Sequence, residues 1–149
     1  MFDIHHLAEL AQVSGLSAAV VRDDDTDQKP GDTNVKSGLW WQLAVKWLSA
    51  GGVLVVPYDK DELHHGPATR KGHGAHYALL VGIAEAEGSD DILLVGMHGL
   101  SKRPLVMSVG ELRSSNAQLR EVKRTGNSKA WVVGAEGMRL ASRALFIWS

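Results

Sequence analysis

Apolar side chains at helical spacing predict two helices in the first third of the chain. Residues 4–14 place one every three or four positions, which is the period of an amphipathic helix. Asp3 suits the N-cap of this helix, and Gly15 suits the position just past its end. A broader apolar stripe runs through residues 37–50, where the tryptophans are interpreted as core residues, and a glycine pair at 51–52 is expected to end it.

Shorter apolar runs predict the strands. A β-branched run begins at Val53, and Pro57 is expected to close it because proline has no N–H to give to a ladder. A further strand is expected from His76 to Ile83, and residues 92–97 are expected to pair with it antiparallel. The other strand candidates are residues 16–21, 105–107, 130–133 and 144–148.

The pattern of apolar residues is weaker between the strand candidates at residues 105–107 and 130–133. Residues 108–111, Ser-Val-Gly-Glu, have the spacing of a capping box and predict the start of a brief helix. Residues 113–127 are mostly polar and are expected to be irregular. Helices followed by antiparallel strands are typical of the α+β class, and the length suits one domain over residues 1–149.

Composition narrows the range of partners. The net charge of −1 and the scattered basic residues give no electrostatic footprint for nucleic acid. No apolar run has the length of a bilayer span, so no membrane partner is expected and the default localisation is cytoplasmic. The chain has no cysteine, which excludes disulfides, cysteine-based zinc sites and a thiol nucleophile of its own. The oligomeric state is left open.

Two neighbouring segments carry a family resemblance. They are Pro57-Tyr58-Asp59-Lys60-Asp61 and residues 70–78, Arg-Lys-Gly-His-Gly-Ala-His-Tyr-Ala. Together they resemble the second half of the actin maturation proteases, which are eukaryotic aminopeptidases related to papain-like, bacteriocin-processing cysteine peptidases. The similarity extends to residues 1–2, 112–119 and 131–137. It implies a papain-like cysteine peptidase fold, truncated at its N-terminus, with two helices followed by an antiparallel sheet.

The resemblance also implies a reaction. The family removes the acetylated N-terminal residue of immature actin by thiolate attack, and the histidine before an aromatic residue, here His76, is the catalytic base. The family's cysteine lies upstream, in a segment ending in Cys-Gly. This chain is therefore expected to be the C-terminal, histidine-bearing part of such a domain and to be inactive alone, with the actin N-terminus as its partner. His98 occupies the place of the residue that orients the base, although an imidazole adds no negative charge there.

Three alternatives remain open at this point. His76 would also fit a structural histidine at a strand edge, satisfied by a backbone carbonyl. The fold would also fit a non-catalytic, actin-binding pseudoenzyme. A metal-binding domain is the third, although the spacing of its candidate ligands is not diagnostic, and neither a metal nor a cofactor is expected. These ligands are His64, His65, His73, His76, Asp59, Asp61 and Glu62.

Charged residues near the family motif bear on the substrate. Lys60, Arg70 and Lys71 would attract an acidic actin N-terminus, although solvated surface cations are the more common case. An acidic run at residues 23–27 lacks the glycine and the closing glutamate of an EF-hand and is interpreted as a solvated loop.

Overall fold

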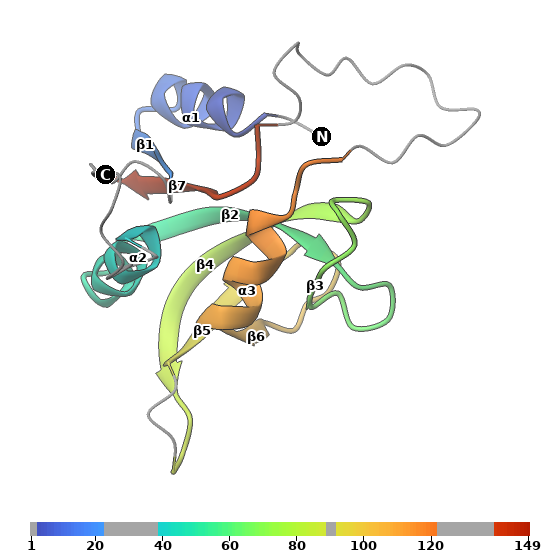
Figure 1. The fold of residues 1–149 in the computed structure, drawn as a ribbon. Helices are drawn as coiled ribbons and strands as arrows, with labels where there is room; N and C mark the ends of the chain where they lie inside the picture. The colour runs from blue at the N-terminus through green and yellow to red at the C-terminus, as the bar shows by residue number, and fades with distance from the viewer. Residues whose placement is uncertain (1–2, 23–38, 89–91, 122–138) are drawn as a thin grey trace, which may run out of the picture.

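The computed structural model describes residues 3–22, 39–88, 92–121 and 139–149 (Figure 1). The acidic run at 23–27 and the strand expected at 130–133 lie outside these residues. The helices in the described part are α1 (Ile4–Val13), α2 (Leu39–Ser49) and α3 (Val109–Ala117). The strands are β1 (Ser17–Arg22), β2 (Val53–Lys60), β3 (Pro67–Ala68), β4 (Ala75–Glu85), β5 (Ile92–Met97), β6 (Leu105–Ser108) and β7 (Arg143–Trp148).

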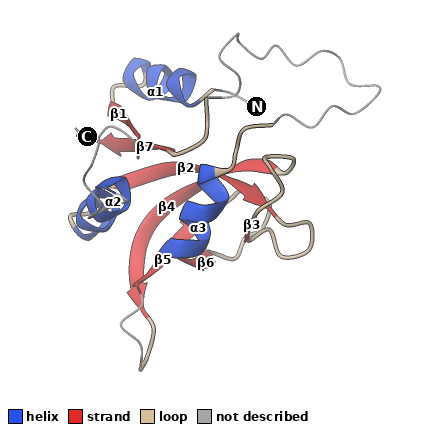
Figure 2. Cartoon of the chain, viewed as in Figure 1, coloured by secondary structure: helices blue, strands red, loops and turns tan. Residues whose placement is uncertain are grey.

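The α+β class and the antiparallel sheet are confirmed (Figure 2). The expected order of two helices followed by a sheet is wrong, because β1 precedes α2 and a third helix, α3, follows β6. The strands lie in the order β1-β7-β2-β4-β5-β6, with β3 paired to β2. The predicted pairing of β4 with β5 is present, with Leu79 opposite Met97. Within the described chain, none of the helices is long and apolar enough to cross a bilayer.

The sheet packs against helices on both faces. The larger buried cluster joins α2 and α3 to one face through Ala44, Leu48 and Leu112. A smaller cluster joins α1 to the other face through Ile4 and Leu145. The interpretation of the tryptophans as core residues is confirmed for Trp41 and Trp47, which pack against the larger cluster.

Local signals set α1 as predicted. The Asp3 side chain accepts a hydrogen bond from the His5 amide at 2.9 Å, as an N-cap does. After the helix, Gly15 has a φ of +83°, a left-handed conformation that glycine adopts without steric cost.

Pro57 does not close its strand, so this prediction was wrong. β2 pairs with β7 only from Val53 to Val55, whereas its pairing with β4 continues past Pro57 to Asp59. The Lys60 amide donates to the Gly74 carbonyl on the β4 side, so the backbone groups of Pro57 point to the other side. The ladder with β7 has already ended there, and the missing N–H costs no hydrogen bond.

Residues 113–117 are helical, so the irregular segment expected there was also wrong in that part. The capping box of Ser108 and Glu111 is present and starts α3 as predicted. The helix then continues because Leu112, Ser115 and Asn116 are buried against the sheet. Two of these three side chains are polar, and for that reason the apolar pattern did not reveal the buried face.

The turn after α2 packs closely against the Trp47 ring, and a substitution at Gly52 tests this packing. A Cβ on Gly52 would lie 2.2 Å from Nε1 of Trp47, whose ring packs edge-on against Phe146 and Trp148. Gly52→Ala should therefore lower the free energy of unfolding by about 1–3 kcal/mol, measured by urea denaturation followed by circular dichroism. Gly110→Ala is the matched control, because a Cβ meets nothing within 4 Å at that helical position. It should raise the free energy of unfolding by roughly 0.5–1 kcal/mol, and equal effects of the two changes would contradict this packing.

Candidate active site

The site lies where the end of β2 meets the start of β4. Tyr58 of β2 is directly opposite His76 of β4, and the next pair is Asp59 with Ala75. The Tyr58 ring is fully buried in the larger core cluster, so cross-strand pairing places His76 on the same face of the sheet. The two rings lie edge to face with centroids 6.0 Å apart. The pairing of β2 with β4 therefore supports the His76 imidazole.

The His76 ring bonds the main chain of His98. Its Nε2 lies 2.5 Å from the His98 carbonyl oxygen. A carbonyl only accepts hydrogen bonds, so Nε2 must carry the proton and donate it. No hydrogen bond joins Nδ1 of His76 to any other described residue, and the side chain is half-buried. In this tautomer Nδ1 carries no proton and is available to accept one.

The structure brings the two predicted site residues together, but the rings do not bond each other. His98 directly follows β5 and is 6% exposed. Its ring centroid lies 6.4 Å from that of His76, and its Nδ1 accepts from the Leu100 amide at 3.3 Å. Burial lowers the pKa of His98, and electrostatic repulsion from the neighbouring His65, His76 and Lys60 side chains lowers it further. This lowered pKa favours the neutral form of the His98 ring.

A third histidine, His65, belongs to the same cluster. Its ring centroid is 5.4 Å from that of His98, and its carbonyl accepts from the Tyr58 hydroxyl at 2.8 Å. Burial and the charge of Asp61 raise the pKa of Tyr58 to about 12, so the hydroxyl remains a donor. The sequence pointed to His65 only as a metal ligand. Its place depends on a left-handed turn, φ +61°, which no pattern of residues indicated.

The other candidate metal ligands do not converge with these histidines. His64 is exposed beside Asp61, and His73 contacts Glu121 at 3.2 Å. The Asp59 carboxylate accepts from backbone amides instead. In the part of the chain that the structure describes, no group of three or more histidine, aspartate or glutamate side chains is arranged to hold a metal ion.

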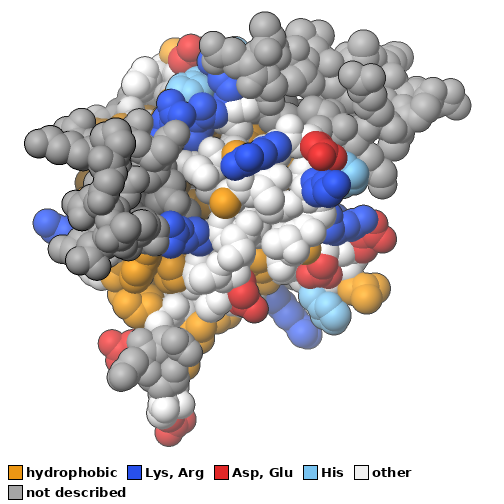
Figure 3. Space-filling model, in the orientation of Figure 1, with side chains coloured by type: hydrophobic (Ala, Val, Ile, Leu, Met, Phe, Trp, Pro, Cys, Tyr) orange, Lys and Arg blue, Asp and Glu red, His pale blue; other side chains and the backbone are white. Residues whose placement is uncertain are grey.

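Basic and acidic side chains alternate near β3, on the right of the surface in Figure 3. Arg70 pairs with Glu62 at 2.9 Å, and Lys71 lies 4.0 Å from Glu121. Lys60 has no carboxylate partner among the described residues. It follows Tyr58 by two positions in β2 and so lies on the same face of the sheet as His76.

Comparison with known proteins identifies relatives of this chain. The family described as actin maturation protease-like, C-terminal domain, matches residues 1–84. An actin maturation protease of Drosophila melanogaster is 40% identical over 74 residues, which cover 50% of this chain and 27% of that protein. A human protein of the same name is 44% identical over 41 residues, which cover 28% of this chain and 11% of that protein. The aligned part thus spans about a quarter or less of these relatives. No solved structure matches the chain.

Proposed function

The chain belongs to the actin maturation protease-like family, whose C-terminal domain matches residues 1–84, and we propose that it supplies the catalytic base of a cysteine aminopeptidase. The proposed substrate is the acetylated N-terminus of immature actin. The observation that carries this proposal is the hydrogen bond from His76 Nε2 to the His98 carbonyl at 2.5 Å. The sheet and its helices would then be the base-bearing part of a papain-like domain.

The chemistry follows from the tautomer of His76. The chain has no cysteine, so the thiol must come from a segment outside these 149 residues. Its proton passes to His76 Nδ1, and the thiolate attacks the carbonyl carbon of the first residue of actin. The imidazolium then returns the proton to the leaving amine, which becomes the new N-terminus of actin. Water then attacks the remaining thioester while His76 takes its proton, and the released thiolate regains that proton from the imidazolium.

In this mechanism His98 acts through its main chain. The carbonyl fixes the orientation of His76 and stabilises the imidazolium by accepting a hydrogen bond from its Nε2–H group. A structural histidine would make the same bond, and two features favour the base: Nδ1 has no hydrogen-bond partner among the described residues, and the half-buried ring is not sealed in the core.

The test uses a chimera in which this chain replaces the matching C-terminal part of the Drosophila relative. A cysteine paired with an imidazole reacts with iodoacetamide at a pH well below that of a free thiol. We expect one such fast-reacting cysteine in the chimera, and His76→Ala should remove it. His98→Ala is the matched control, because it keeps the carbonyl and should keep the fast reaction. A cysteine equally reactive after His76→Ala would contradict the proposed base.

Lys60 is proposed to favour an acidic substrate. Arg70 and Lys71 already face carboxylates, whereas Lys60 has none among the described residues and its charge reaches the histidine cluster. Lys60→Gln should lower kcat/KM of the chimera for an acidic N-terminal peptide about fivefold, as for an interaction of about 1 kcal/mol. Arg70→Gln should change it little. Equal effects of the two changes at low salt would argue against this role for Lys60.

The absence of cysteine also favours a second candidate, a non-catalytic module that binds actin. Such a module would bind an acetylated actin peptide as well after His76→Ala as before. Titration of the isolated chain with that peptide, followed by fluorescence anisotropy, measures this binding directly. Peptide binding by the chain, together with no fast-reacting cysteine in the chimera, would favour the non-catalytic module.

A further inference from the structure

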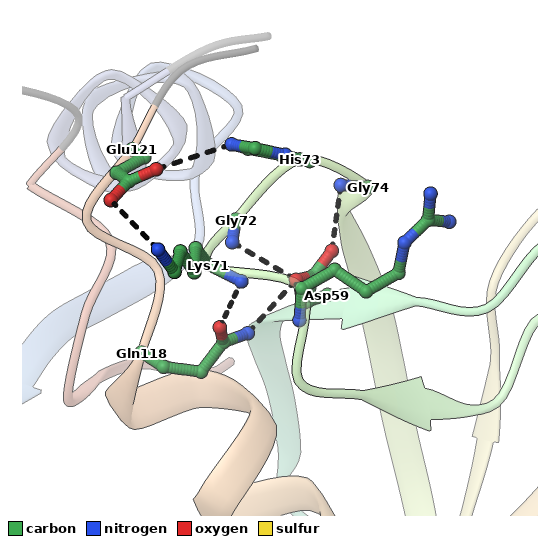
Figure 4. A network of polar contacts seen from close by, with 8 residues as sticks. Asp59, Lys71, Gly72, His73, Gly74, Gln118 and Glu121 are labelled. Carbon is green, nitrogen blue, oxygen red and sulfur yellow. Dashed lines mark hydrogen bonds and ion pairs between the residues drawn. The ribbon is translucent and has the colours of Figure 1, made fainter.

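A single buried carboxylate organises the loop that leads into β4. Asp59 is fully buried, with 0% of its surface exposed. Its Oδ2 accepts from the amides of Arg70 at 2.6 Å and Gly72 at 2.9 Å, and its Oδ1 accepts from the amide of Gly74 at 2.6 Å. Figure 4 shows the loop of residues 70–74 curled around this side chain.

The end of α3 completes the arrangement. Nε2 of Gln118 donates to Oδ2 of Asp59 at 2.9 Å, and Oε1 of Gln118 accepts from the Lys71 amide (Figure 4). The Glu121 amide donates to the Lys71 carbonyl at 3.0 Å, and its carboxylate contacts His73. The loop is thus fixed from its inner side by Asp59 and from its outer side by the chain after α3.

The hydrogen bonds keep Asp59 ionised. Burial by itself raises the pKa of a carboxyl, but the bonds from Gln118 and from the three loop amides outweigh it and lower the pKa of Asp59 below its usual value. Its four contacts all come from N–H groups that need an acceptor. A charged acceptor bonds such donors more strongly than a neutral one.

This loop is closely coupled to His76. A Cβ on Gly74 would lie 2.6 Å from the Lys60 carbonyl and 2.9 Å from Oδ1 of Asp59, so the backbone is seated tightly against β2. The next residue, Ala75, is the cross-strand partner of Asp59, and His76 follows it. A shift of the loop would therefore also displace the His76 imidazole, because His76 follows Gly74 by only two positions.

We propose that Asp59 is a positioning residue for His76: by holding residues 70–74 it keeps the imidazole within hydrogen-bond distance of the His98 carbonyl. An effect of Asp59 on catalysis rests on the proposed function. Its effect on the position of His76 can be measured in this chain without any reaction. A residue that only stabilised the fold would change the unfolding free energy without changing the tautomer of His76 in the folded protein.

The experiment measures the ring nitrogens of His76 in the ¹⁵N-labelled chain by NMR, with circular dichroism as a check of folding. Asp59→Asn keeps the size of the side chain but removes its charge and one acceptor. It should shift the His76 tautomer ratio away from the Nε2-protonated form by about fivefold, the loss of roughly one net hydrogen bond. Asp61→Asn is the matched control. Asp61 likewise accepts from three amides, those of Leu63, His64 and Gly66, but its loop does not lead into β4, so the ratio should change much less than in Asp59→Asn.

The outcomes separate the two proposals. A folded Asp59→Asn protein with the parent tautomer ratio would overturn the positioning role and leave the proposed function standing. If Asp59→Asn does not fold, Gln118→Ala decides, since it leaves Asp59 in place: a shift in the same direction supports the role, and an unchanged ratio overturns it. A parent protein with the proton on Nδ1 would overturn the positioning role and contradict the proposed function, because Nε2 would then not donate to the His98 carbonyl.

Discussion

Replacing His76 with alanine should lower the turnover of the chimera about a thousandfold, the usual loss when a general base is removed. The reason is that the His76 ring supplies the proton acceptor of the proposed mechanism, whereas Nδ1 of the neighbouring His98 ring already accepts from the Leu100 amide. Release of the acetylated residue from an actin N-terminal peptide, followed by mass spectrometry, gives kcat and KM separately. We expect the loss in kcat.

The control for this change lies three residues upstream. His73 is exposed and contacts Glu121 at 3.2 Å, so His73→Ala removes an imidazole from the same loop without touching the proposed site. It should leave kcat within about twofold, as expected for a surface change of a few tenths of a kcal/mol. A comparable loss from both substitutions would mean that the loop, and not the His76 ring, matters for turnover.

Asn116→Ala should lower the free energy of unfolding by about 3 kcal/mol, because it leaves buried carbonyl groups without a donor. Nδ2 of Asn116 lies 2.8 Å from the Pro57 carbonyl, 3.1 Å from that of Arg143 and 3.4 Å from that of Leu140. The Asn116 side chain thus donates to carbonyls of both segments just beyond the end of the β2–β7 ladder. Urea denaturation of the chain measures the change.

Ser114→Ala is the matched control for Asn116, since it lies on the exposed side of α3. It should change the unfolding free energy by less than about 0.5 kcal/mol. Asn116→Asp should be at least as harmful as alanine, because a carboxylate would then face carbonyl oxygens. Full stability of Asn116→Asp would show that the carbonyls have other donors and would refute this explanation.

Local signals were enough for part of the fold. The helix period, the cap at Asp3 and the glycine at position 15 all act within a few residues, and α1 forms as they predict. The same is true of the capping box at Ser108 and Glu111. The β4–β5 hairpin was also predictable, since two apolar runs separated by a polar turn pair antiparallel.

The errors arose where partners distant in sequence decide the structure. Pro57 continues a strand because β7 pairs with β2 only as far as Val55. Residues 113–117 are helical because Ser115 and Asn116 bond the backbone of β2: the Ser115 hydroxyl accepts from the Asp59 amide at 2.8 Å, 56 positions away in sequence. No periodicity of apolar residues reveals such a polar interface.

The candidate site was predicted as a pair of residues but not as atoms. The family motif pointed to His76 and the neighbouring strand to His98, and the structure brings them together. Their catalytic roles stay predictions. A sequence names side chains, so it pointed to the His98 ring, whereas the contact is made by its carbonyl. Asp59 belonged to the family motif, but as a site residue it was considered only as a metal ligand, because its bonds to loop amides depend on the path of the backbone.

The most direct test of the proposed aminopeptidase function measures the mass of an actin N-terminal peptide. The peptide is incubated with the chimera, with its His76→Ala variant and with this chain alone. If the chain supplies the base of a cysteine aminopeptidase, the chimera removes the acetylated residue, and neither the variant nor the cysteine-free chain does so. Processing by the chain alone, or by the His76→Ala chimera at the parent rate, would contradict it.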